Sequence, residues 1–104
     1  MFVDRIDWFE GALEFALTKQ KFAKAKILEV WDKTGKLQVF KYKRKMKVVH
    51  RFEDNITEME VKISNLKINK VAISWSASDK KIEMFINGKK IAEQEFFLKP
   101  SYIG

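Results

Sequence analysis

The residues of this chain with the clearest capacity for chemistry form a basic run between positions 41 and 47. Ammonium and guanidinium groups at this density bind phosphates or acidic polymers, and a tyrosine among them can contact the ligand as well. A solvated strand whose lysines block edge-to-edge aggregation would give the same pattern without any ligand. The run supplies the first candidate ligand-binding residues, which are Lys41, Tyr42, Lys43, Arg44, Lys45 and Lys47.

The charge of the protein is concentrated around this run. The chain has a formal charge of +7, and residues 19–51 contain twelve Lys or Arg against only Glu29 and Asp32. This excess bears on partners and solubility rather than on the fold, and it makes nucleic acid an alternative partner for residues 19–51. Two local geometries remain open. A single strand would place the four lysines on one face, whereas a hairpin would place residues 43–45 at its tip.

Aromatic side chains offer a second kind of binding chemistry, because a sugar-binding module needs one or two exposed rings as stacking platforms. Fourteen of the 104 residues are aromatic, and most should be in the core. Trp8, Phe9, Trp31 and Tyr42 are less clearly inward-facing than Trp75. Trp8 and Trp31 therefore complete the candidate ligand-binding set, although core packing explains each of them without a ligand.

The composition excludes several classes of site. There is no cysteine, which excludes disulfides, thiolate metal sites and a cysteine nucleophile. The single histidine, His50, argues against a histidine-based zinc site and against any serine-histidine-aspartate arrangement that does not use it. Asp32, Asp54 and Asp79 follow no calcium-binding spacing. We therefore predict no catalytic residue, no metal and no cofactor, and expect His50 to be structural.

Period-two alternation and turn residues predict eight strands that must position these groups. Asn87-Gly88 between two alternating runs is a strong hairpin signal, because both residues tolerate the positive φ of a type I′ turn. Residues 18–27 fit either a helical turn or a loop. The spacing predicts an antiparallel sandwich or barrel, with strands at residues 12–18, 25–31, 36–42, 46–52, 58–64, 70–76, 81–86 and 89–96.

The length predicts a single domain, residues 1–104, with a short C-terminal tail at residues 97–104. This tail is apolar, so it could cover the end of the sandwich or dock onto a second copy in a homo-oligomer. No apolar run approaches the roughly 18–20 residues that span a bilayer. The N-terminus has no basic region followed by an apolar one, which favours a cytoplasmic location over secretion.

Residues Lys70–Ile91 resemble paired strands of the concanavalin A-like lectin/glucanase superfamily, including laminin G-like domains. In those domains a strand ending in Trp precedes a turn, an apolar strand, Asn-Gly or Asp-Gly, and a return strand. Gly11–Leu17 resembles an earlier strand of the same domains, and Ile27–Tyr42 resembles the next two strands. The resemblance implies a jelly-roll sandwich covering residues 11–96. The chain is shorter than typical members, so strands would be missing or supplied by a partner chain.

Some glycoside hydrolases of this superfamily, resembling laminarinases, carry Glu-Ile-Asp-x-x-Glu on one strand, which provides the nucleophile and the acid/base. Residues 5–10 here read Arg-Ile-Asp-Trp-Phe-Glu, so Asp7 and Glu10 match but Arg5 replaces the nucleophile. A retaining mechanism fails without that carboxylate. Asp7 and Glu10 about 5 Å apart in an open groove would revive the comparison.

The sequence therefore predicts a non-catalytic β-sandwich module for binding or assembly, recognising a carbohydrate or a protein partner. Two alternatives remain open. One is a basic surface that binds nucleic acid or another acidic polymer through residues 19–51. The other is a structural domain that forms homo-oligomers through an edge strand or an apolar face.

Overall fold

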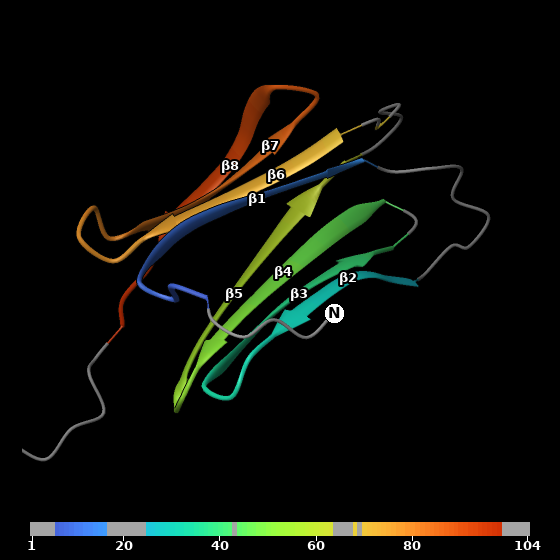
Figure 1. The fold of residues 1–104 in the computed structure, drawn as a ribbon. Coiled ribbons are helices and arrows are strands. Elements are labelled where there is room, and N and C mark those ends of the chain that lie inside the picture. Colours follow the sequence, from blue (N-terminus) through green and yellow to red (C-terminus); the bar gives the residue numbers. More distant parts are fainter. Residues whose placement is uncertain (1–5, 17–24, 43, 64–67, 69, 99–104) are drawn as a thin grey trace, which may run out of the picture.

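The computed structural model describes residues 6–16, 25–42, 44–63, 68 and 70–98, which form two antiparallel four-stranded sheets (Figure 1). One sheet has the order β1-β6-β7-β8, with bounds Glu10–Ala16, Lys70–Ser76, Lys81–Ile86 and Lys89–Glu95. The other has the order β2-β3-β4-β5, with bounds Ala25–Trp31, Gly35–Lys41, Lys45–Phe52 and Asn55–Lys62. The predicted all-β sandwich is confirmed. No helix long and apolar enough to cross a membrane occurs in these ranges.

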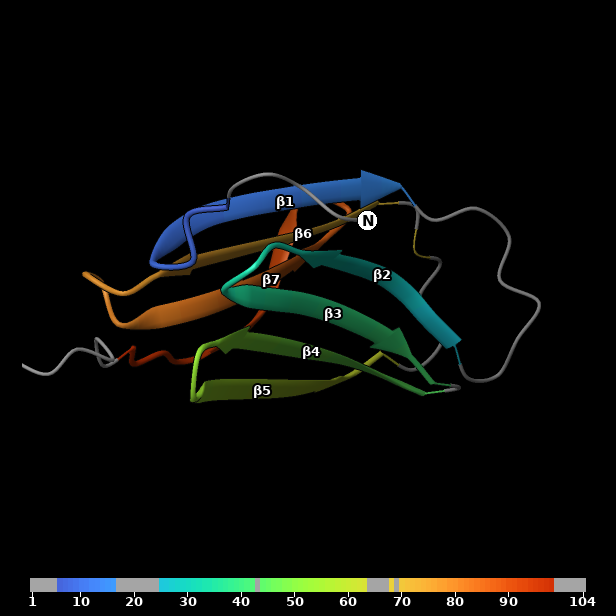
Figure 2. The same cartoon turned by 60° about the horizontal axis from the view of Figure 1, so that its bottom comes forward.

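All eight predicted strands are present, with ends that shift by up to three residues. Strands β2 to β5 follow one another as a meander, and β6 to β8 form a second meander that β1 joins at its edge (Figure 2). The chain therefore changes sheet only between β1 and β2 and between β5 and β6. Most of the ambiguous segment 18–27 lies outside the described residues, but its last three residues begin β2.

Alternating side chains of the central strands fill the space between the sheets. Burial alternates along β4, β6 and β7, so each strand presents one apolar row inward and one mostly polar row outward. Each fully buried aliphatic side chain contributes roughly 1.5–3 kcal/mol. A slip of one residue would expose a whole row, so the register is strongly specified. The central rows contain Leu37, Val39, Met46, Val48, Val71, Ile73, Trp75, Ile82, Met84 and Ile86.

The β7–β8 hairpin turns at Asn87-Gly88, as predicted, with φ of 51° and 83° at the two residues. Gly88 has φ in the region that other residues adopt only under strain. Asn87 also links this turn to β6, because its Oδ1 accepts a hydrogen bond from the Lys70 backbone N–H at 3.0 Å. The turn is therefore fixed to the neighbouring strand as well as to its own hairpin.

The two sheets are joined along one side by a bond between their edge strands. The Gln94 side chain of β8 donates through Nε2 to the Glu58 carbonyl of β5 at 2.6 Å. On the other side, β1 and β2 are the edge strands of the two sheets. The strands of both sheets run between the same two ends of the molecule. The turns β2–β3, β4–β5 and β6–β7 gather at one end, and β3–β4 and β7–β8 at the other (Figure 1).

Candidate functional site

Residues 6–9 cross the end of the sandwich where the β2–β3 turn lies and connect the two sheets. On one side, Trp8 donates from Nε1 to both carboxylate oxygens of Asp32, at 2.9 Å each. On the other, the Trp75 indole donates to the Asp7 carbonyl at 3.0 Å, and the Ala77 N–H donates to the Phe9 carbonyl at 2.7 Å. This segment is therefore held in place by both sheets. We call this part of the molecule the cleft end.

Asp32 organises the β2–β3 turn beneath this segment. Besides Trp8, its carboxylate accepts hydrogen bonds from the Ile6 N–H, from the Thr34 N–H and hydroxyl, and from the Gly35 N–H, at 2.7–3.1 Å. Partial burial would raise the pKa of Asp32, but the bonds from Thr34, Trp8 and Ile6 outweigh it and hold the pKa at about 2. Asp32 is therefore ionised at neutral pH and acts as an anchor.

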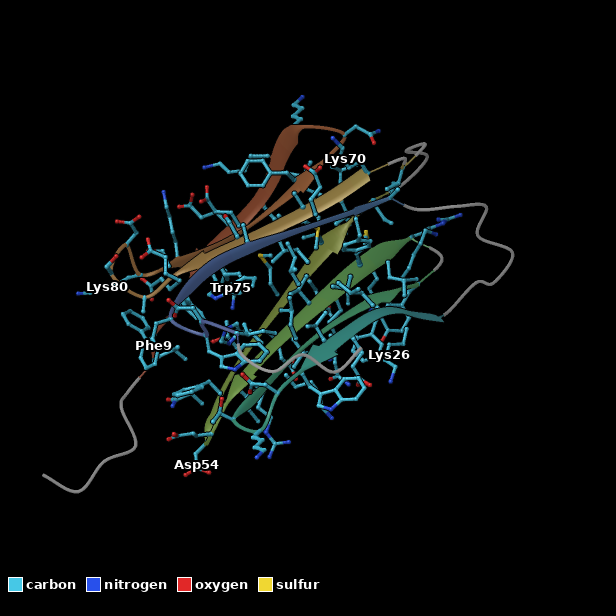
Figure 3. All side chains as sticks on the ribbon, viewed as in Figure 1. Phe9, Lys26, Asp54, Lys70, Trp75 and Lys80 are labelled. Carbon is cyan, nitrogen blue, oxygen red and sulfur yellow. The ribbon has the colours of Figure 1, made fainter. Side chains whose placement is uncertain are left out.

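A cleft of about 730 Å³ opens beside this anchor. The Phe9 ring is 38% exposed and meets Phe52 edge to face, with ring centroids 5.0 Å apart. Figure 3 shows Phe9 at the same end of the sandwich as Asp54 and Lys80, which belong to the β4–β5 and β6–β7 turns. The cleft is lined by Ile6, Asp7, Trp8, Phe9, Asp32, Lys33, Thr34 and Phe52.

Polar groups of the cleft flank the two phenylalanine rings. Asp7 accepts the N–H groups of Phe9 and Glu10 at Oδ1, at 2.9 and 3.1 Å. Its other oxygen has no hydrogen-bond partner among the described residues. Lys33 is exposed and forms no ion pair within the part of the chain that the structure describes. The cleft thus combines ring surfaces with one free carboxylate oxygen and one ammonium group.

His50 is buried directly beneath the cleft, with no exposed surface. Its Nε2 lies 3.0 Å from the Trp8 carbonyl, so Nε2 carries the proton, because a carbonyl only accepts. Its Nδ1 is buried without a hydrogen-bond partner among the described residues. The rings of Trp8, Trp75 and Phe96 surround it, with centroids 4.7–5.6 Å away.

This environment keeps His50 neutral. Burial lowers the pKa of His50 to about 4, although the hydrogen bond to the Trp8 carbonyl opposes the change. The neutral ring packs as a flat, mostly apolar group under Trp8 and adds no charge to the cleft. The expectation of a structural histidine fits this position.

The basic run forms the β3–β4 turn, which selects the hairpin interpretation over the single strand. The Tyr42 N–H donates to the Lys45 carbonyl at 2.8 Å, and the Lys45 ammonium lies 5.2 Å from the Tyr42 ring centroid. Lys41 ends β3 and Arg44 is exposed in the turn. Lys43 lies outside the described residues.

Two lysines of the run have acidic partners on β5. Lys45 pairs with Glu60 at 3.7 Å, and Lys47 pairs with Glu58 at 3.3 Å. Both glutamates are more than half exposed, so each pair is worth at most about 1 kcal/mol. Lys47 therefore lies on the outer face of the sheet, where Glu58 compensates its charge. Lys41, Arg44 and Lys45 lie together at the β3–β4 end of the same sheet.

The two candidate tryptophans do not join the basic run. Trp31 lies opposite Lys36 near the start of β3, and Lys41 ends that strand, roughly 17 Å away at 3.3 Å per residue. Trp31 is half-buried. Trp8 is only 2% exposed, so its ring offers no open face to a sugar, as core packing predicts. The candidate residues are thus divided between the two ends of the sandwich.

The exposed aromatic group at the cleft is Phe9, next to Trp8 in the sequence. The sequence marks Phe9 as one of the less clearly inward-facing aromatics but does not place it in the candidate ligand-binding set, and it gives no signal for Phe52. Asp-Lys-Thr-Gly at residues 32–35 indicates a turn, but nothing in the sequence links it to Trp8.

No family model matches this chain, and no curated protein or solved structure matches it significantly. A functional assignment therefore depends on the geometry of the described residues.

Proposed function

We propose that this protein is a non-catalytic binding module of the concanavalin A-like, jelly-roll kind that takes a saccharide in the cleft at residues 6–9 and 32–34. The observation that carries the proposal is the open cleft itself, in which Phe9 is exposed beside Phe52. The C–H face of a pyranose packs on an aromatic ring, while its hydroxyls need hydrogen-bond partners. Asp7 and Lys33 would supply an acceptor and a donor at the rim.

The rigidity of the cleft supports this proposal. The Asp32 carboxylate accepts from five donors, which belong to Ile6 and Trp8 of the crossing segment and to Thr34 and Gly35 of the β2–β3 turn. A rigid cleft loses little conformational entropy when a ligand binds, which favours recognition by a small number of contacts. Because Asp32 is saturated by these bonds, it would act as a positioning residue, and the contacts would come from Phe9, Asp7 and Lys33.

A protein partner, including a second copy of this chain, is the second candidate. The observation that favours it is the exposure of two further large apolar side chains, Phe97 at 54% and Ile56 at 59%. The Phe96 N–H donates to the Lys80 carbonyl, which places Phe97 next to the β6–β7 turn at the cleft end. An exposed aromatic ring such as that of Phe97 is a typical anchor in protein interfaces.

A titration of the ¹⁵N-labelled protein with neutral gluco-oligosaccharides would test the proposal. We expect amide shifts confined to residues 6–9, 32–35 and 52, and about tenfold weaker binding for Phe9→Ala, since a ring contact is worth about 1 kcal/mol or slightly more. Phe97→Ala is the matched control, because that ring is exposed but does not line the cleft.

Three outcomes would count against saccharide binding. One is the absence of shifts with every sugar, and another is equal affinity of Phe9→Ala and the parent protein. The third is a dimer mass in X-ray scattering that Phe97→Ala reduces to the monomer mass, because this would support the assembly function instead.

A further inference from the structure

The end of the sandwich opposite the cleft gathers cationic side chains from both sheets. In the second sheet Lys41 ends β3, Lys45 begins β4 and Lys62 ends β5, while Arg44 lies in the turn between β3 and β4. In the first sheet Lys70 begins β6 and Lys89 begins β8. Figure 3 shows Lys26, at the start of β2, and Lys70 at this same end, on different sheets. We call it the basic end, comprising Lys41, Arg44, Lys45, Lys62, Lys70 and Lys89.

Pairing and hydrogen bonds bring the members of the basic end close to one another. Lys45 lies directly opposite Lys62 in the β4–β5 ladder, and the Ile63 N–H donates to the Arg44 carbonyl at 3.0 Å. In the other sheet, the Asn87 N–H donates to the Lys70 carbonyl at 2.9 Å, which places the β7–β8 turn beside β6. Lys89 follows that turn directly.

Most of these cations lack an acidic partner. Among the described residues, Lys41, Arg44, Lys62 and Lys89 form no ion pair, whereas Lys45 and Lys70 pair with the exposed Glu60 and Glu14. Two lysines directly opposite each other in a ladder repel and destabilise the sheet. This repulsion lowers the stability of the fold, and a negatively charged ligand bound between the lysines would offset it.

The cleft end has the opposite electrostatic character. The segment and turns that form it contain Asp7, Asp32, Glu53, Asp54 and Asp79 against Lys33 and Lys80. The sandwich is therefore polarised along its strands. A polyanion approaching such a molecule is steered toward the basic end, because the field attracts it there and repels it from the cleft.

We infer that the basic end binds the phosphate backbone of nucleic acid. Tyr42 favours nucleic acid over a sulfated polysaccharide, because an aromatic ring beside Arg44 and Lys45 can stack on a base. An anionic membrane is disfavoured, because the large exposed apolar side chains of the described residues are Phe9, Ile56 and Phe97, none at the basic end. Five of the six cations are lysines, which act as point charges, so we expect little sequence specificity.

This surface is separate from the proposed saccharide cleft, and the inference does not depend on it. Phe9 and Lys33 lie at the cleft end, while Lys62 and Lys89 lie at the far ends of their strands. A substitution at one end therefore leaves the chemistry of the other unchanged. The two proposals can succeed or fail independently.

Fluorescence anisotropy with a labelled single-stranded DNA of mixed sequence, and with its duplex, tests the inference. If the basic end neutralises about four phosphates, raising NaCl from 50 to 200 mM weakens binding roughly 50-fold for the single strand and more for the duplex. Lys62→Ser with Lys89→Ser removes one cation from each sheet. We expect this variant to bind about tenfold or more weakly at 50 mM NaCl, with a shallower salt dependence.

The matched control is Lys33→Ser with Lys80→Ser, which makes the same change in net charge at the cleft end. Its DNA affinity should stay within about threefold of the parent protein. Equal loss in both double variants would show that only net charge matters and would overturn the inference. So would binding of heparin, or of vesicles containing phosphatidylserine, by a protein that fails to bind either DNA.

Discussion

The indole Nε1 of Trp8 lies 2.9 Å from both carboxylate oxygens of Asp32, 24 residues further along the chain. This pair joins the segment that crosses the cleft end to the turn beneath it. The Asp32 carboxylate also stabilises the β2–β3 turn by accepting from the backbone N–H groups of Thr34 and Gly35. A single side chain thus fixes both walls of the candidate ligand cleft.

Replacing Asp32 by Asn should therefore destabilise the protein and loosen the cleft. Asparagine has the same shape, but its NH₂ group replaces one of the two carboxylate oxygens. Backbone or indole N–H groups that donate to that oxygen would then face another donor. We expect a loss of about 3 kcal/mol in the free energy of unfolding, since charge-assisted bonds are worth about 1.5–3 kcal/mol each. Urea denaturation at pH 7 measures it.

Asp54→Asn is the control for this substitution, because Asp54 is an exposed turn residue without a side-chain hydrogen bond among the described residues. It should shift the urea midpoint very little. A midpoint for Asp32→Asn close to that of Asp54→Asn would show that the Trp8–Asp32 contact is not needed for stability.

Much of this fold could be predicted from local patterns. Alternation in Val71, Ile73 and Trp75 specifies a strand with one buried face, and Asn87-Gly88 specifies the turn after β7. Both signals act between residues close in sequence, where steric preferences of the backbone decide the structure. The eight strands followed from them, with ends within three residues of those observed.

The candidate site was harder to predict because its contacts are not local. Trp8 and Asp32 are 24 residues apart, and Trp75 reaches the Asp7 carbonyl across 68 residues. No period or turn residue encodes such pairs. The basic run was visible in the sequence, but its convergence with Lys70 and Lys89 depends on how two sheets are stacked. Only the arrangement of the strands decides that.

Gly35 and Gly88 should respond differently to alanine. A Cβ at Gly35 would lie 2.6 Å from the Arg51 carbonyl oxygen and 2.6 Å from Cε2 of Trp8, so backbone or indole must move. Such overpacking costs about 1–3 kcal/mol. At Gly88 no atom lies within 4 Å, but φ of 83° strains any other residue, at a cost of about 1 kcal/mol.

Thermal and urea denaturation of Gly35→Ala and Gly88→Ala would compare these costs directly. We expect Gly35→Ala to be the less stable variant and to change the near-ultraviolet circular dichroism, because the Trp8 environment changes. Gly88→Ala should leave that spectrum as it is. The reverse order of stability would contradict the close packing of Trp8 on the β2–β3 turn.

The free energy of unfolding should depend on pH through His50. Its pKa is lowered from 6.5 to about 4 in the folded protein, so between these values the unfolded chain binds a proton that the folded protein does not. The folded state therefore loses stability as pH falls from 6.5 toward 4, by about 2 kcal/mol between pH 7 and pH 4.5. Asp32 affects the free energy of unfolding at lower pH. Its pKa of about 2 in the folded protein is below the ordinary value of 3.8, so its protonation lowers stability only as pH falls below about 3.8.

Urea titrations at pH 7, 5.5 and 4.5 would measure this loss, and His50→Gln is the comparison. Glutamine can still donate to the Trp8 carbonyl but does not titrate, so the variant should be less stable at pH 7 and yet lose less stability on acidification. An NMR titration of the His50 ring gives the folded pKa itself. A ring that titrates near 6.5 in the folded protein would mean that His50 is accessible to water, and that the aromatic cluster of Trp8, Trp75 and Phe96 does not exclude it.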